Sequence, residues 1–248
     1  MARVVLASQF EWYLKELSSP PQGCFVDTNL LFAADYEVHR LYDEAVELGE
    51  ALLSHQIPIF SNVTIRSELL ELKRRVLIGE ALLDFLEMGQ KHLPVRVVNS
   101  LRSLKTSIRE SIATGSHYLL SDRQIKKSRD LFESEIGPGT WKDFCSKFIG
   151  DKLESEWERQ VERKGINYLD GRPSEHLTSP IEWSDAIRLI EAFGIGTSDA
   201  MILNIFLKSV FPFIVTADSD VAYCMANVDS DKTVVVPDSL DFPARKFD

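Results

Sequence analysis

GCFVDTNLLF, residues 23–32, is the first stretch of this 248-residue chain in which a short apolar run has the form of a buried strand. The run CFV leads directly into Asp27, so the predicted strand ends on a carboxylate. FIVTADSD, residues 213–220, repeats the pattern, because its apolar run is followed by Asp218 and Asp220. An ionised carboxylate beside a buried strand is costly unless its charge is compensated, so these positions indicate function.

Strand and helix patterns alternate downstream of the first segment. RLYDEAVELGEALLSH carries apolar residues at helical spacing, and IPIF at residues 57–60 is a second strand candidate. SNVTIRSELLELKRRVL then begins with Ser61 or Asn62 as a helix cap. This order of strand, helix, strand and helix is typical of a parallel sheet covered by helices.

The alternation resumes near the C-terminal end. Ser179 begins a sequence with proline at the first helical position and glutamate three residues after the cap, which predicts a helix that ends near Gly194. A second helix is expected to be capped by Thr197 or Ser198, and KTVVVP at residues 232–237 is the last strand candidate. We therefore expect an α/β protein, specifically a three-layer α/β/α sandwich with a central, mostly parallel sheet.

The patterns divide the chain into four parts. Residues 1–22 carry apolar side chains close to helical spacing and predict an N-terminal helix. Residues 100–165 show consecutive helical patterns without strand runs, and residues 100–179 are predicted to form a helical insertion. The α/β core then comprises residues 23–99 and 180–237, and residues 238–248 form a C-terminal tail.

Composition excludes several classes of protein. The chain is 44% hydrophobic and 27% charged, as expected of a globular protein. A formal net charge of −10 argues against a protein that coats nucleic acid non-specifically. No stretch approaches the roughly 20 apolar residues of a membrane span, so we expect a cytoplasmic protein with no membrane association. The three cysteines are far apart and are expected to be reduced thiols, mostly buried.

Four carboxylates occupy comparable positions in these elements. Asp27 and Asp218 follow predicted strands, Glu68 lies near the start of the helix after the second strand, and Asp199 lies in the first turn of a later helix. The carboxyl ends of parallel strands share one edge of a sheet, where ligands bind. We therefore expect the four side chains to converge there, although they are remote in sequence.

Each acid also has a structural alternative. Asp199 suits a first helical turn, where the macrodipole favours negative charge. Glu68 can be a solvated helix residue paired with a nearby base, and the two aspartates after FIVT can be turn residues. Asp27 is the hardest to explain in this way, because it directly follows a buried run. The joint pattern carries more weight than any single acid.

Four motifs in the expected order resemble those of the PIN-domain nucleases, a superfamily that includes the ribonuclease toxins of bacterial toxin–antitoxin pairs. They are FVDTN, SNVTIRSELLEL, GTSDAMIL and FIVTADSD. The resemblance covers about residues 23–99 and 180–237, and it does not cover the N-terminal helix or the helical insertion. The step of 131 residues from Glu68 to Asp199 is much longer than in the compact toxins. The resemblance implies RNA as the substrate and leaves open an antitoxin-like partner and a homodimer.

Crowded carboxylates need a compensating charge, which a divalent cation can supply. Their hard oxygen ligands suit Mg²⁺ or Mn²⁺, and the lack of a His/Cys cluster argues against zinc. A metal held by Asp27, Asp199 and Asp218 would lower the pKa of a bound water and direct it at a phosphodiester, while Glu68 or a second ion would steady the leaving oxygen. The arrangement implies 5′-phosphate and 3′-hydroxyl products, as the resemblance also suggests.

Other residues of the motifs have supporting roles in this interpretation. Asn29, Ser198 and Thr216 are predicted to donate hydrogen bonds that orient the carboxylates. Asp220 is either a further metal ligand or a turn residue.

Substrate contact requires positive charge. Residues 96–129 contain eight bases and two acids, a local balance of +6. Phosphate contact is one interpretation of this segment and a solvated helix face is the other. The residues predicted to bind substrate are Lys73, Arg74, Arg75, Arg102, Lys105 and Arg109. Aromatic side chains in the middle of the chain, Tyr118, Trp141 and Trp157, can stack on bases but are more often core residues at helical spacing.

Two further classes are disfavoured, and one alternative remains. A haloacid-dehalogenase-type phosphatase needs a second acid two residues after Asp27, where this chain has Asn29. P-loop and dinucleotide-binding motifs are absent from the sequence. The alternative to a metal-dependent ribonuclease is a non-catalytic PIN-like module that binds or scaffolds partners through the helical insertion.

Overall fold

The computed structural model describes residues 2–89, 91–114, 118–169 and 175–241. The chain forms two compact units. The sheet unit contains Met1–Glu37, Leu41–Leu69 and Gln160–Asp248, and the helical unit contains Val38–Arg40 and Leu70–Arg159.

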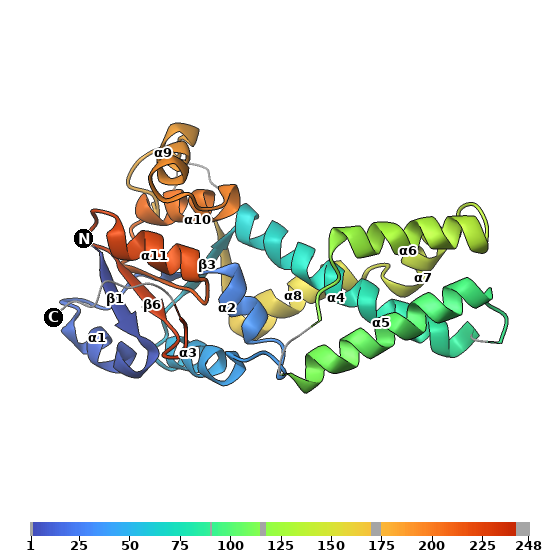
Figure 1. Cartoon of the computed structure of the whole chain (residues 1–248). Helices are drawn as coiled ribbons and strands as arrows, with labels where there is room; N and C mark the ends of the chain where they lie inside the picture. The colour runs from blue at the N-terminus through green and yellow to red at the C-terminus, as the bar shows by residue number, and fades with distance from the viewer. Residues whose placement is uncertain (1, 90, 115–117, 170–174, 242–248) are drawn as a thin grey trace. The chain divides into compact units, whose positions relative to one another are not determined.

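The sheet unit contains a six-stranded sheet in the order β1-β6-β5-β2-β3-β4, and every pair of neighbouring strands is parallel (Figure 1). The strands are β1 (Arg3–Leu6), β2 (Cys24–Val26), β3 (Ile59–Asn62), β4 (Ile166–Leu169), β5 (Phe213–Val215) and β6 (Thr233–Val236). The predicted α/β class with a parallel sheet is therefore confirmed. The central strands β2 and β5 are neighbours, with Val26 in register with Val215, so the residues that follow them meet at one edge.

Helices pack on both faces of this sheet. The helices of the sheet unit are η1 (Ala7–Gln9), α1 (Phe10–Glu16), α2 (Thr28–Ala33), α3 (Tyr42–Ser54), α9 (Trp183–Phe193), α10 (Thr197–Leu207) and α11 (Ser219–Asn227). Phe25 of β2 lies 6.3 Å from Phe206 of α10, measured between ring centroids. Val26, the next residue of β2, points to the opposite face and lines a cavity with residues of α3. Both observations are consistent with three layers.

The N-terminal segment differs from its prediction. Instead of a helix through residues 1–22, the chain forms β1 first and only then the short helices η1 and α1. Val4 and Val5 pair in parallel register with Val234 and Val235 of β6. β-branched side chains favour this extended, packed environment, so a tertiary partner overrides the helix-like spacing of the apolar residues.

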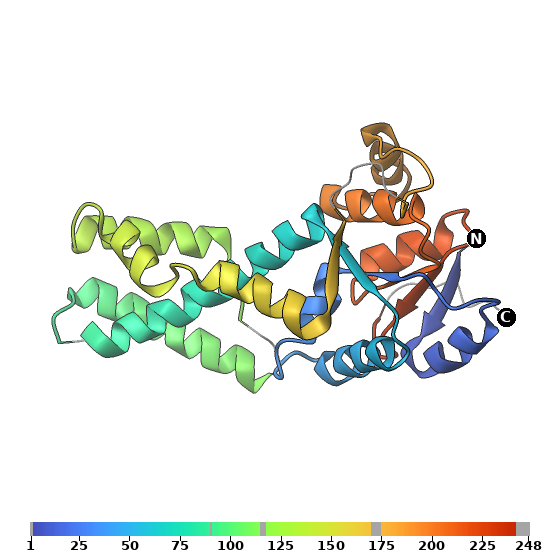
Figure 2. The ribbon, with the colours of Figure 1, turned by 180° about the vertical axis from the view of Figure 1, so that it is seen from behind.

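A second edge strand lies inside the predicted helical insertion. β4 pairs along its whole length with β3 and belongs to the sheet unit (Figure 2). Its residues INYL have no alternating pattern of their own, and Asn167 and Tyr168 are exposed. The predicted insertion of residues 100–179 thus extends too far at its C-terminal end, because residues from Gln160 onward belong to the sheet unit.

The helical unit also begins earlier than the predicted insertion. It contains α5 (Val95–Ala113), α6 (Asp122–Glu135) and α7 (Thr140–Phe148), while α4 (Val63–Gly89) and α8 (Lys152–Lys164) each continue from one unit into the other. The C-terminal half of α4 buries Ile78, Leu82 and Leu86 in the core of the helical unit. This packing moves the boundary from residue 100 to Leu70.

Aromatic residues of the helical unit form its core. Phe132 is fully buried and packs against Phe85, Trp141 and Phe144. Trp157 is 7% exposed, and Tyr118 and Trp141 are partly buried against the same core. The core interpretation of the three predicted stacking residues is therefore the one that the packing supports.

Two helix starts are displaced from their predicted caps. α9 is capped at Glu182 rather than at Ser179, and α10 is capped at Gly196 rather than at Thr197 or Ser198. Tertiary donors explain the first shift, because the Pro180 carbonyl accepts from Lys208 Nζ and the Glu182 carbonyl accepts from Asn204 Nδ2. The Glu182 carbonyl also accepts from the Asp185 amide at 3.2 Å, which forms the first turn of α9.

Other local predictions are confirmed. Asn62 Oδ1 caps α4 by accepting a hydrogen bond from the Ile65 amide at 2.9 Å. Ser121 and Gln124 form a capping box at α6, and Gly194 ends α9 in the left-handed conformation. The three cysteines are free thiols. In the described part of the chain, no single helix is long and apolar enough to cross a bilayer.

Gly49 lies in the middle of α3, and a Cβ atom built there would meet no heavy atom within 4 Å. Glycine inside a helix costs about 0.5–1 kcal/mol relative to alanine. We therefore expect Gly49→Ala to raise the free energy of unfolding by that amount in urea titrations. Gly194→Ala is the matched control, since its φ of +68° should make alanine destabilising there. A lower stability of Gly49→Ala than of the wild type would contradict the prediction.

Candidate active site

Asp27 is held at the junction between β2 and α2. Its amide donates to the Val215 carbonyl of β5 at 2.9 Å, which extends the pairing of the two strands by one residue. Its carboxylate caps α2 by accepting from the Thr28 amide at 2.7 Å. The side chain is only 2% exposed. The sequence pattern of a buried strand followed by a capping aspartate thus places a carboxylate in the interior of the sheet edge.

Asp218 performs the corresponding role after β5. Its Oδ1 atom caps α11 by accepting from the amides of Asp220 at 2.7 Å and Val221 at 3.0 Å. Thr216 lies between the two acids. Its hydroxyl donates to Asp27 Oδ2 at 2.8 Å and accepts from the Asp218 amide at 2.9 Å. The predicted role of Thr216 in orienting a carboxylate agrees with this geometry.

The first turn of α2 reaches two other acids. Asn29 Nδ2 donates to Asp218 Oδ2 at 2.6 Å. The Thr28 hydroxyl donates to Glu68 Oε2, on α4, at 2.8 Å. Thr28 is buried and was not among the predicted site residues, although it lies within the FVDTN motif. Its position could have identified Thr28, because a residue directly after the capping Asp27 lies at the same edge of the sheet as the acids.

Asp199 lies in the first turn of α10, as predicted, and a backbone hydrogen bond from Gly196 supports its carboxylate. The approach is close, because a Cβ atom at Gly196 would lie 2.9 Å from Asp199 Oδ2. A larger residue at this cap would therefore have to displace the Asp199 carboxylate. Ser198 is half-buried and makes no side-chain hydrogen bond within the described residues, so its predicted orienting role has no contact to support it.

The electrostatics of the site link all five acids. Burial is the main cause that raises the pKa of Asp27 to about 7, and the charges of Asp218 and Glu68 add to it, against the lowering effect of the Thr216 hydrogen bond. Burial likewise raises the pKa of Asp199 to about 7, with contributions from Asp218, Glu68 and Asp220. The acids that the sequence placed in four separate motifs therefore act on one another.

The donor set suits a hard divalent cation, since it consists of carboxylate oxygens. Within the described residues, however, no group of three or more His, Cys, Asp or Glu side chains lies close enough to hold a metal ion. Protein donors occupy the oxygens instead: both of Asp27, both of Asp218 and one of Glu68 accept hydrogen bonds. The chemistry of the residues fits Mg²⁺ or Mn²⁺, whereas their positions do not form a ready three-ligand site.

Three consecutive bases, all predicted to contact substrate, have internal partners in the helical unit. Lys73 is 1% exposed, and its ammonium lies 3.0 Å from Glu156. Arg74 pairs with Glu71 and Asp122. Arg75 Nε donates to the Leu120 carbonyl. Lys73 in particular is buried, so its ammonium is not accessible to a phosphate of the substrate.

The bases of α5 are more accessible. Arg102 and Arg109 are exposed, and Lys105 pairs with Glu87 at 2.7 Å. Four further bases, Arg123, Lys126, Lys127 and Arg129, are exposed on α6. Exposed bases are thus clustered on α5 and α6, whereas the bases of the KRR sequence on α4 have internal partners.

Removal of the Thr216 hydroxyl should disturb both strand-end acids. We expect Thr216→Val to lower the free energy of unfolding by about 1–3 kcal/mol, because the fully buried hydroxyl makes two hydrogen bonds whose partners would be left unsatisfied. Thr233→Val in β6 is the comparison, because Thr233 is also buried but its side chain hydrogen-bonds to Tyr13 and not to a carboxylate. Chemical denaturation measures the free energy of unfolding of both variants. An equal decrease in the two would contradict a particular contribution of the Thr216 hydrogen bonds to stability.

Comparisons of the chain with models of known protein families, with curated proteins and with solved structures found no match.

Proposed function

We propose that this chain is a metal-dependent nuclease of PIN-like fold, and that its substrate is RNA. The observation that carries the proposal is the electrostatic coupling of Asp27, Glu68, Asp199 and Asp218, which come from four different elements of the sheet unit. Acids with pKa values raised by burial and by one another are typical of functional sites. The order of the four motifs along the chain supports the PIN-like assignment and, through the resemblance, the choice of RNA.

The residues of the site have distinct tasks in this proposal. Asp27, Asp199 and Asp218 are the cation ligands, and Glu68 acts beside them. Thr216 and Asn29 hold the carboxylates of Asp27 and Asp218 in fixed orientations. When bound, Mg²⁺ or Mn²⁺ would neutralise the carboxylates and activate water for attack on a phosphodiester, which leaves 5′-phosphate and 3′-hydroxyl ends.

Cation binding in this site must compete with protons. At neutral pH, a carboxyl with a pKa of about 7 is protonated in about half of the molecules, which applies to Asp27 and Asp199. A cation prefers the ionised forms, so metal affinity should rise with pH through this range.

A second candidate function is a non-catalytic module of the same fold. It is favoured by one observation, that the described acids form no group of three able to hold a metal while their oxygens are satisfied by hydroxyl, amide and backbone donors. In that case the acids stabilise helix starts, and the exposed bases of α5 and α6 bind a partner.

Metal titration and cleavage assays distinguish the two candidates. We expect the wild type to bind Mn²⁺ in calorimetry more tightly at pH 8 than at pH 6, and Asp27→Asn to bind at least about tenfold more weakly at pH 8. Glu191→Gln is the control, because Glu191 is an exposed acid of α9. End-labelled RNA and DNA of one sequence, incubated with Mn²⁺, report the substrate, and ligation of the products reports their 5′-phosphate. Absence of both metal binding and cleavage would favour the non-catalytic module.

A further inference from the structure

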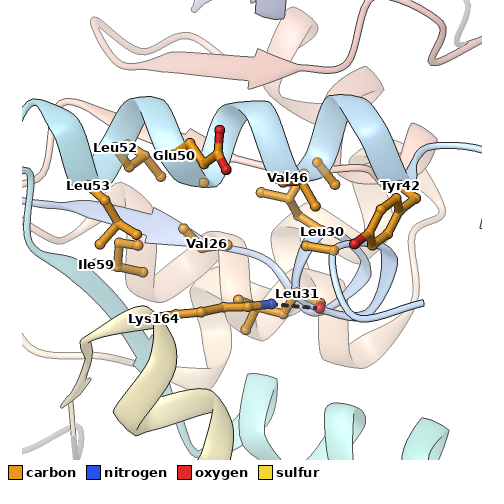
Figure 3. Close-up of a pocket in the computed structure, with 13 residues that line it drawn as sticks. Val26, Leu30, Leu31, Tyr42, Val46, Glu50, Leu52, Leu53, Ile59 and Lys164 are labelled. Atoms are coloured by element: carbon orange, nitrogen blue, oxygen red, sulfur yellow. Dashed lines mark hydrogen bonds between the residues drawn. The ribbon is translucent and has the colours of Figure 1, made fainter. Parts of the chain in front are cut away.

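The sheet unit and the helical unit each contain a cavity, and the two differ in chemistry. The cavity of the sheet unit, of about 420 Å³, is lined mainly by aliphatic side chains of β2, α2 and α3 (Figure 3). The cavity of the helical unit, of about 360 Å³, is lined by α5, α6 and the segment before α6, largely with polar side chains. Polar groups in a cavity determine the orientation and identity of its ligand, so the second cavity is expected to select a polar one.

Serine hydroxyls form much of the wall of this second cavity. Ser100, Ser103 and Ser107 lie on one face of α5, because spacings of three and four residues match the helical repeat. Ser128 lines the cavity from α6. Within the described residues, none of these four side chains makes a hydrogen bond. Their hydroxyls are therefore available to a ligand.

The segment before α6 adds a further donor. Tyr118 Oη accepts a hydrogen bond from Gln124 Nε2 at 2.6 Å. Gln124 Oε1 accepts in turn from the amide and the hydroxyl of Ser121, so Gln124 fixes the position of the tyrosine. In the part of the chain that the structure describes, no acceptor takes the O–H of Tyr118. This hydroxyl is thus a second kind of donor for a ligand.

Lys127 supplies the charge of the lining. It is exposed on α6 and has no ion pair or hydrogen bond within the described residues. Asp130, one turn further along α6, is paired with Arg129. Asp122, in the first turn of α6, is paired with Arg74. Among the described residues no carboxylate lines the cavity, so its ammonium and hydroxyl donors favour an anion.

The donors and the length of the cavity define the class of anion. Hydroxyl donors outnumber charged ones, which suits a phosphate, since its three terminal oxygens accept hydrogen bonds and carry a charge of about −1.5 to −2 at pH 7. Ser100 and Ser107 lie about 10 Å apart along the axis of α5, further than one phosphate reaches. The remaining hydroxyls suit polar groups of the same ligand, and Leu101, Leu104 and Leu120 form an apolar wall for its carbon skeleton.

We propose that this cavity binds a small phosphorylated sugar. The phosphate accepts hydrogen bonds from Lys127 Nζ and from serine and tyrosine hydroxyls, and the sugar hydroxyls bond to the remaining serines. A phosphodiester of RNA has fewer free oxygens and a single charge, so a phosphate monoester matches this donor set better. All of the lining residues belong to the helical unit, so the proposal does not depend on nuclease activity.

Calorimetry with ribose 5-phosphate, in a buffer without phosphate or divalent cations, tests the proposal on the full chain. We expect saturable binding with one site. Ribose lacks the phosphate and should bind at least about a hundredfold more weakly, and inorganic phosphate lacks the sugar contacts and should bind about tenfold more weakly. Tetrauridylate without terminal phosphates supplies only phosphodiesters and should not displace ribose 5-phosphate.

Variants locate the binding. Lys127→Met removes the ammonium and should weaken binding of ribose 5-phosphate by about tenfold to a hundredfold. Ser103→Ala combined with Ser107→Ala removes two donors and should weaken binding by about tenfold or more. Alanine is the best helix former, so α5 should remain folded, which circular dichroism checks. Lys126→Met is the matched control, because Lys126 is an exposed lysine of the same helix outside the lining, and it should bind like the wild type.

Four outcomes would overturn the proposal. They are the absence of saturable binding of ribose 5-phosphate to the wild type, equal binding of ribose, unchanged binding in both cavity variants, and an equal loss in Lys126→Met and Lys127→Met, which would indicate attraction by the general charge of α6. If tetrauridylate displaces ribose 5-phosphate, the cavity contacts a nucleic-acid backbone and the sugar-phosphate proposal is wrong.

Discussion

Asp199→Asn is expected to lower the rate of metal-dependent RNA cleavage by about 100- to 1000-fold. The carboxylate lies in the first turn of α10, feels the charges of Asp218 and Glu68, and is a proposed cation ligand. Asparagine has the same size, so it fits against Gly196, but it offers a neutral and weaker ligand. Losses of this size are typical when one electrostatic contact of a transition state is removed.

The loss should be catalytic and not structural. Burial and, after it, repulsion by neighbouring acids raise the pKa of Asp199. An uncharged asparagine removes both penalties, so the free energy of unfolding at pH 8 should be unchanged or higher. Single-turnover cleavage of end-labelled RNA with Mn²⁺ gives the rate, and urea titration gives the stability.

Two other acids serve as reference variants for this rate. Asp220→Asn should cost less than about tenfold, because Asp220 is exposed and contributes its backbone amide to the cap of α11. Glu191→Gln should cost nothing. Wild-type cleavage by Asp199→Asn would contradict the proposed function, whereas absence of cleavage in the wild type would leave the non-catalytic module as the better account.

The central strands could be predicted because their signals are local. CFV and FIV are short apolar runs bounded by acids, and parallel pairing of β2 with β5 follows once helices alternate with them. The same reasoning brings Asp27 and Asp218 to one edge of the sheet. Their separation of 191 residues in the chain does not matter, since the register of two strands decides the contact.

The edge strands could not be predicted in the same way. β1 and β4 have one neighbour each in the sheet, so their extended conformation depends on β6 and β3 rather than on their own sequences. RVVL also fits a helical pattern when it is read together with the residues that follow. The unit boundary at Leu70 was missed for a related reason, because α4 is one continuous helix across it.

The arrangement of the site was only partly predictable. The sequence indicates which acids meet, but it does not show that Thr216 contacts two of them or that Thr28 donates to Glu68. Nor does it show that Lys73 is buried against Glu156, since a KRR sequence on a helix looks exposed. Contacts of this kind depend on side-chain positions in three dimensions, which residue spacing does not contain.

The free energy of unfolding of Asp27→Asn, compared with that of the wild type, should increase as pH rises from about 4 to 7. The pKa of Asp27 is 3.8 when unperturbed and about 7 in the fold, so between these values the folded state binds more protons than the unfolded state. The contribution of Asp27 to the free energy of unfolding therefore decreases as pH rises through this range, and it is lowest above pH 7. The raised pKa corresponds to a loss of at most about 4 kcal/mol in the free energy of unfolding of the wild type. The variant avoids this loss because asparagine does not ionise.

Urea titrations of the wild type and Asp27→Asn at pH 4.5, 6 and 8 measure this difference directly. Mn²⁺ adds a second test, because a cation that binds the ionised carboxylates stabilises the wild type at pH 8 by about 2.7 kcal/mol at a hundred times its Kd. The variant lacks one of the ligands and should gain much less. A difference in stability that stays constant from pH 4.5 to 8 would mean that Asp27 ionises normally, and the buried, charge-coupled acid on which the metal site depends would no longer be supported.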